Sequence, residues 1–160
     1  MNREKTCCFT GHRIIAKNDI TLLPQRLELV IKQLVSLNVT DFIAGGALGF
    51  DTLSALTVLQ ARKEFPSIRL ILALPCKNQA ANWRKSDILL YEKIKAEADE
   101  VIYLADEYYN GCMAARNRFM VDNSSHCVFY LASTRSGTAY TVKYALENNI
   151  TMHNIMIKGD

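Results

Sequence analysis

Short apolar runs alternate with longer segments of helical period along the whole chain. The apolar runs predict strands at residues 6–10, 41–44, 69–74, 100–105, 127–131 and, more weakly, 152–156. Between them, apolar residues recur at spacings near three and four and predict helices at residues 22–37, 51–65, 83–98, 114–123 and 138–148. This alternation is typical of a mostly parallel sheet that carries helices on both faces.

The sequence therefore predicts an α/β fold, with a doubly wound, Rossmann-like sheet of five to six strands. The 160 residues suit one domain, and no linker or internal repeat divides them, so we expect a single domain over residues 1–160. In open sheets of this kind, ligands bind beyond the carboxyl ends of the strands, where the winding direction reverses. The residues that directly follow each strand are therefore the candidate site residues.

Composition and charge remove several classes of protein. With 49% hydrophobic and 22% charged residues the chain has an ordinary globular composition, and its net charge of +3 does not by itself indicate a nucleic-acid or membrane surface. No apolar run reaches the roughly 18 residues of a membrane-spanning helix, and no secretory signal core is visible, so we expect a cytoplasmic protein without a membrane partner. The five cysteines lack zinc-site spacing, and no metal is expected.

The loop after the first predicted strand has residue types that suit a phosphate. Its sequence is Thr10-Gly11-His12-Arg13, in which Gly11 allows a sharp turn and Arg13 offers a planar, permanently charged fork. We take Thr10, Gly11 and Arg13 as candidate ligand contacts, against the alternative of an exposed turn with a surface arginine.

The loop after the second strand is rich in glycine and leads into a helix. Gly45, Gly46 and Gly49 leave backbone amides free near the start of a helix dipole, which is a typical anion site. A bulky side chain at Gly46 is expected to block the ligand and leave the fold largely intact. Asp51 is interpreted first as a helix cap and second as an acceptor for a ribose hydroxyl.

Two later segments supply further candidates. Arg116 and Arg118 lie near the start of a predicted helix, where the dipole favours anions, and this mismatch suggests a bound anion. The loop after the fifth strand contains Ser136, Gly137 and Thr138 at a second helix start. Because these loops follow strands of one parallel sheet, we expect them to converge on a nucleotide or another phosphorylated small ligand.

The same residues resemble a known superfamily. Thr-Gly-His-Arg, Gly-Gly-Ala-Leu-Gly-Phe-Asp, Arg-Asn-Arg and Ser-Gly-Thr occur in this order, and over residues 6–148 they resemble the Rossmann-like SLOG superfamily. That superfamily includes the DNA-processing protein A family, the Lonely Guy phosphoribohydrolases and a YpsA-like bacterial branch. The stretch 75–83, with Gln79 and Trp83, and the following residues 91–99 look most like the YpsA-like branch.

The resemblance implies roles for several candidates. In the DNA-processing family, which binds single-stranded DNA, the corresponding residues imply phosphate contacts from Gly45, Gly46, Gly49 and Arg116. Lonely Guy enzymes cleave the base from a nucleoside 5′-monophosphate with an arginine and a glutamate. Here residues 116–120 match the arginine motif, but Tyr140 or Thr141 stands where the catalytic glutamate is expected.

From these similarities we expect a nucleotide-binding or nucleotide-sensing protein, with NAD- and ADP-ribose-derived compounds among its candidate ligands. The alternatives are a nucleoside 5′-monophosphate phosphoribohydrolase-like enzyme and a single-stranded DNA-binding protein. We assign no cofactor. Because the glutamate is missing, the sequence assigns no catalytic activity, and it leaves a homo-oligomer open.

Overall fold

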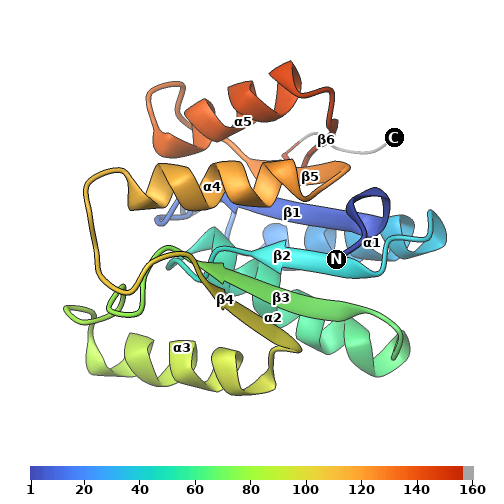
Figure 1. The fold of residues 1–160 in the computed structure, drawn as a ribbon. Helices are drawn as coiled ribbons and strands as arrows, with labels where there is room; N and C mark the ends of the chain where they lie inside the picture. Colours follow the sequence, from blue (N-terminus) through green and yellow to red (C-terminus); the bar gives the residue numbers. More distant parts are fainter. Residues whose placement is uncertain (157–160) are drawn as a thin grey trace.

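The computed structural model describes residues 1–156 and contains one sheet of six parallel strands (Figure 1). The strands are β1 (Thr6–Gly11), β2 (Asp41–Ala44), β3 (Arg69–Leu74), β4 (Glu100–Tyr103), β5 (His126–Tyr130) and β6 (Thr151–Asn154). The helices are α1 (Leu23–Ser36), α2 (Phe50–Glu64), α3 (Lys85–Glu97), α4 (Cys112–Asp122) and α5 (Gly137–Glu147), and a short 3₁₀ turn (Arg3–Lys5) precedes β1. The predicted α/β, Rossmann-like fold is confirmed.

Helices cover both faces of the sheet because its central strands are apolar on both sides. In β1, Cys7 and Phe9 are buried in a core that they share with α1, α2 and α3, whereas Cys8 is buried in a second core with α4 and α5. Successive side chains of a strand point to opposite faces, so an unbroken apolar run requires a helix layer on each side. Figure 1 shows α4 in front of the sheet and α1 behind it.

The predicted elements are all present, with small differences at their ends. Residues 104–105 were expected in β4, but the strand ends at Tyr103. Helix α4 begins at Cys112, two residues before the predicted start, because Gly111 adopts a positive φ of 97° and forms the N-cap. Helix α3 begins two residues later than predicted, and Trp83 lies in the turn that precedes it.

The strand order places the winding reversal between β1 and β5. The order is β4-β3-β2-β1-β5-β6, so the chain steps from β1 outward to β4 and then returns to the other side of β1. The loops after β1 and β5 consequently lie side by side, and the Ala132 amide donates a hydrogen bond of 2.8 Å to Nε2 of His12. Within residues 1–156, no helix has both the length and the apolar character needed to cross a membrane.

Candidate functional site

A polar cleft of about 280 Å³ opens at the winding reversal, beyond the carboxyl ends of β1 and β5. It is lined by residues from the loops after β1, β2 and β5 and from α4, namely Thr10, Gly11, His12, Arg13, Ala47, Asp51, Met113, Arg116, Asn117, Ser136, Gly137 and Thr138. Eight of the eleven residues selected from sequence lie in this lining. His12, Ala47, Met113 and Asn117 were not selected, although His12 and Asn117 belong to motifs that were recognised.

The start of α5 presents two free amides to the cleft. Ser136 is the N-cap of α5, and its Oγ accepts a hydrogen bond of 3.1 Å from the Ala139 amide. Over residues 1–156, the amides of Gly137 and Thr138 have no protein acceptor. Free amides at a helix N-terminus are donors for an anion, and the helix dipole favours negative charge at the same point.

Arg13 brings an unpaired positive charge to the same cleft. Its side chain is exposed, and no hydrogen bond or ion pair holds it among the described residues. A guanidinium without a partner keeps its five donors for a ligand.

Arg116 has a different environment, because it is buried and already bonded within the protein. Only 4% of the residue is exposed, its Nη1 donates to the Gly45 carbonyl, and its Nε donates to Asn117 Oδ1 at 2.8 Å. Burial lowers the pKa of Arg116, and the nearby Asp51 carboxylate opposes that shift. Arg116 therefore holds the glycine-rich loop in place in addition to lining the cleft.

Asp51 is a buried carboxyl group at the start of α2. Gly49, with φ 78°, is the N-cap of this helix, so the expectation that Asp51 itself is the cap is wrong. Asp51 Oδ2 instead accepts a hydrogen bond of 3.2 Å from the Ala47 amide. Burial raises the pKa of Asp51, and the positive charge of Arg116 counteracts part of that rise.

Two backbone amides at the glycine-rich loop are already bonded within the protein. Asp51 occupies the Ala47 amide, and the His12 carbonyl accepts a hydrogen bond of 3.1 Å from the Phe50 amide. Ala47 and Phe50 therefore offer no free backbone amide to a ligand in the cleft.

The glycines of this loop are required by internal packing. A Cβ on Gly45 would lie 2.6 Å from Arg116 Nη1 and 2.8 Å from Asp51 Oδ2. Gly46 has a φ of 71°, and a Cβ there would overlap Leu74. A bulky residue at Gly46 is therefore expected to strain the fold, which differs from the sequence-based expectation that it leaves the fold largely intact.

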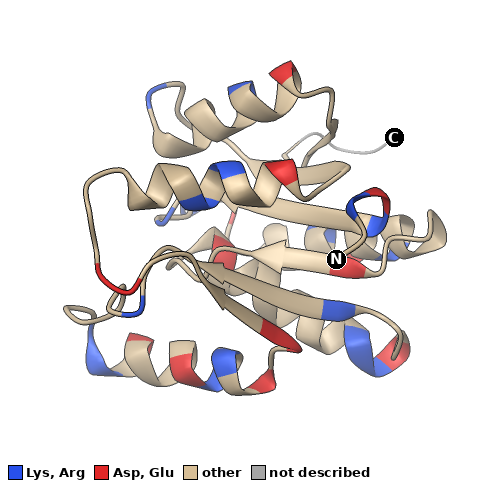
Figure 2. Cartoon of the chain, viewed as in Figure 1, with Lys and Arg blue, Asp and Glu red and all other residues tan. Residues whose placement is uncertain are grey.

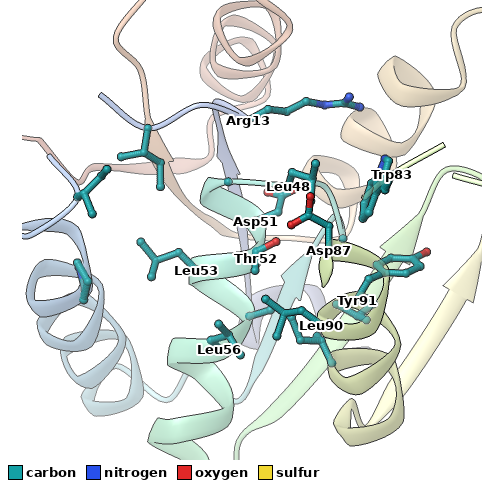
Figure 3. A pocket seen from close by; sticks show the side chains of 18 residues that line it. Arg13, Leu48, Asp51, Thr52, Leu53, Leu56, Trp83, Asp87, Leu90 and Tyr91 are labelled. Atoms are coloured by element: carbon teal, nitrogen blue, oxygen red, sulfur yellow. The ribbon is translucent and has the colours of Figure 1, made fainter. Parts of the chain in front are cut away.

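Three of the selected glycines lie outside the polar cleft. Gly46 and Gly49 line a neighbouring hollow of about 500 Å³, the apolar cavity (Figure 3). Gly45 lies close to the Arg116 guanidinium. The apolar cavity is also lined by Arg13, Ile15, Ile20, Pro24, Leu48, Asp51, Thr52, Leu53, Ala55, Leu56, Leu72, Trp83, Asp87, Leu90, Tyr91 and Ile94. None of these except Arg13 and Asp51 was selected from sequence as a ligand contact.

The fold and the cleft at the winding reversal define an α/β protein of the Rossmann-like class. A family model described as the YspA SLOG family matches residues 9–158, and the chain belongs to this family. The resemblance to the SLOG superfamily and its YpsA-like branch is thereby confirmed.

Two curated relatives agree with this assignment. The uncharacterized SPbeta prophage-derived protein YoqJ of Bacillus subtilis (strain 168) is 31% identical over 136 residues, which cover 77% of this chain and 80% of YoqJ. A UPF0398 protein of Lysinibacillus sphaericus is 23% identical over 152 residues, or 91% of this chain and 85% of that protein.

Two solved structures of DNA processing protein A share the fold. The Streptococcus pneumoniae protein superposes with a TM-score of 0.67 at 20% identity, and the Helicobacter pylori protein with a TM-score of 0.68 at 17% identity. The superpositions cover 93% and 94% of this chain but only 49% and 64% of those two chains. At these identities the similarity establishes the fold alone.

Proposed function

We propose that the polar cleft binds the phosphate of a nucleotide, and that the protein is a nucleotide-binding or nucleotide-sensing member of its family. NAD- and ADP-ribose-derived nucleotides are included in the proposed ligand class. The observation that carries the proposal is the convergence of the unpaired guanidinium of Arg13 and the free amides of Gly137 and Thr138 on one cleft. Charged and amide donors around a small hollow are the groups that bind a phosphate.

Replacement of Arg13 by alanine tests this proposal directly. Because the Arg13 side chain has no partner within the described residues, its loss is expected to leave the free energy of unfolding nearly unchanged. Loss of a charge-assisted hydrogen bond should weaken nucleotide binding by about 1.5 to 3 kcal/mol. Isothermal titration with AMP, ADP, ADP-ribose and NAD would measure the loss.

The matched control is Arg3→Ala. Arg3 precedes β1, at the end of the strand opposite the cleft, so this variant makes the same charge change away from the site. Equal affinities of the two variants for every nucleotide would contradict the proposal, as would wild-type protein that binds none of them.

Single-stranded DNA binding is the second candidate. Its support is the fold shared with DNA processing protein A, since the Helicobacter pylori structure is described by its single-stranded DNA binding mode. Figure 2 shows that α3, α4 and α5 each carry residues of both charge signs, which does not form a uniformly basic face. Fluorescence anisotropy of a labelled oligothymidylate, with and without excess AMP, would distinguish the candidates, because the proposed cleft predicts weak DNA binding that AMP abolishes.

A further inference from the structure

The apolar cavity lies next to the polar cleft and has the size of a small-molecule site. Its volume of about 500 Å³ lies within the usual range for ligand pockets, and its walls are mostly aliphatic and aromatic. Figure 3 shows it between α2, α3 and the segment that joins β1 to α1. Gln79 connects two residues of the cavity wall, because its Nε2 donates hydrogen bonds of 3.3 Å to the Gly46 carbonyl and to the Tyr91 hydroxyl.

The cavity and the cleft share two side chains. Arg13 and Asp51 line both hollows, and the glycine-rich loop forms the wall between them, with Gly46 and Gly49 on the cavity side and Ala47 on the cleft side. The two hollows are therefore neighbours, and a ligand in either of them would meet Arg13 and Asp51.

Among the polar groups of the cavity, Asp87 offers free hydrogen-bond acceptors. Asp87 is half-buried near the start of α3, and no hydrogen bond or ion pair occupies its carboxylate among residues 1–156. Figure 3 shows the Asp87 carboxylate and Asp51 facing the same space, while the Tyr91 hydroxyl points away from it. Trp83 packs edge-on against Tyr91, with ring centroids 5.1 Å apart, and supplies an aromatic wall. Acceptors beside an aromatic wall suit a planar ring that carries amino donors.

We propose that the apolar cavity holds the base of the bound nucleotide. The base carries an exocyclic amino group, which donates a hydrogen bond to the Asp87 carboxylate. This inference rests on the proposed function, because the phosphate in the polar cleft directs the base into the cavity. In this arrangement Trp83 contacts the ring of the base, and Asp87, which lies outside the polar cleft, determines which base is preferred.

The chain offers a direct reporter, because Trp83 is its one tryptophan. AMP is expected to change the emission of Trp83 on binding, whereas ribose 5-phosphate is expected to bind more weakly and leave the emission unchanged. Adenosine should change the emission at concentrations at least tenfold higher than AMP, because it lacks the phosphate.

The base preference is tested with a matched pair of nucleotides. AMP carries an amino group where IMP carries a carbonyl, so AMP should bind at least tenfold more tightly by titration calorimetry. In Asp87→Asn the AMP to IMP affinity ratio should fall toward one, since an amide offers a donor as well as an acceptor. The control Glu97→Gln makes the same change on the exposed side of α3 and should leave the ratio unchanged.

The outcomes separate this inference from the proposed function. If AMP and ribose 5-phosphate bind equally well and neither changes the Trp83 emission, phosphate binding in the polar cleft is supported, but the apolar cavity is not the base site. If IMP binds as tightly as AMP while the emission changes, the ring lies in the cavity but the role of Asp87 is wrong. If adenosine binds as tightly as AMP, the proposal that the polar cleft binds the phosphate is wrong, whereas base binding in the cavity is retained. If no nucleotide binds, both proposals are wrong.

Discussion

Gly46 combines two constraints that can be separated by comparing glycines of this chain. A residue with a side chain is strained at its φ of 71°, and a Cβ would also overlap Leu74. Gly111 has only the first constraint, because its φ is 97° but nothing lies near the added Cβ. Gly137 has neither, since its φ is not positive and open space surrounds it.

Alanine substitutions at these three glycines should therefore differ in a defined order. Gly46→Ala is expected to lower the free energy of unfolding by about 2 to 4 kcal/mol, and Gly111→Ala by about 1 to 2 kcal/mol. Gly137→Ala should remain within about 0.5 kcal/mol of wild type. Urea denaturation would measure all three. A Gly46→Ala protein as stable as Gly137→Ala would show that the loop relaxes around the new side chain.

The role of these glycines could be predicted only in part from sequence. Their clustering after an apolar run correctly marked the loop as unusual. The neighbours that require glycine are Arg116 and Leu74, which lie 71 and 28 positions away in the chain from Gly45 and Gly46, respectively. Local spacing contains no information about such contacts. The bond between Asp51 and the Ala47 amide spans only four residues, and here an acidic residue near a helix start was interpreted as the cap, whereas Gly49 is the N-cap.

At the scale of elements, β6 is one of the two edge strands of the sheet and is held to β5 partly by two histidines. Nδ1 of His126 and Nε2 of His153 are 3.0 Å apart, so one ring donates an N–H that the other accepts as a neutral base. Burial lowers the pKa of both rings below the ordinary 6.5, and the charge of His126 lowers the pKa of His153 further.

The stability of the protein should therefore depend on these histidines in mild acid. Where the folded pKa is below the unfolded one, the unfolded chain binds more protons, so the stability is present above about pH 6.5 and is lost as the pH falls. We expect the pair to account for about 1 kcal/mol or less between pH 7.5 and 5.5, since both rings are half exposed.

Urea denaturation at the two pH values would measure this contribution. His153→Gln should show a smaller loss of stability between pH 7.5 and 5.5 than wild type, while His12, whose pKa burial also lowers, contributes equally in both proteins. An identical pH dependence in the variant would exclude the pair as its source.

Element types were predictable from sequence, and element ends were less so. The apolar runs of a doubly buried sheet and the helical period between them are local patterns, and every strand and helix was found near its predicted position. The start of α4 was missed because it depends on Gly111 adopting a left-handed conformation, and the start of α3 because Trp83 belongs to a cavity wall rather than to the helix.

At the scale of the whole molecule, the winding reversal determines where the candidate site lies. Knowledge that parallel strands share one carboxyl edge was enough to predict which loops meet, and eight selected residues line the polar cleft. The apolar cavity was not predictable, because its lining residues have the same helical spacing as ordinary core residues. Only packing in three dimensions shows that α2, α3 and the segment after β1 leave a hollow between them.

The acids around the cleft also bear on catalysis. Asp106 and Glu107 follow β4 at the same edge of the sheet, but neither lines the cleft, and Asp106 is exposed and pairs with Lys77 at 3.0 Å. Among the lining residues, Asp51 is the one carboxyl group, and it is buried and bonded to the Ala47 amide. Glycosidic cleavage typically uses a pair of carboxyl groups at the scissile bond.

We therefore expect AMP to survive incubation with micromolar protein. A single carboxyl group whose pKa is raised by burial is poorly suited to stabilise an oxocarbenium-like centre, and no second acid in the cleft activates water. Chromatography for free adenine and ribose 5-phosphate is the measurement. Multiple turnovers that are lost in Asp51→Asn and retained in the exposed control Asp106→Asn would make the protein a phosphoribohydrolase and identify Asp51 as its acid.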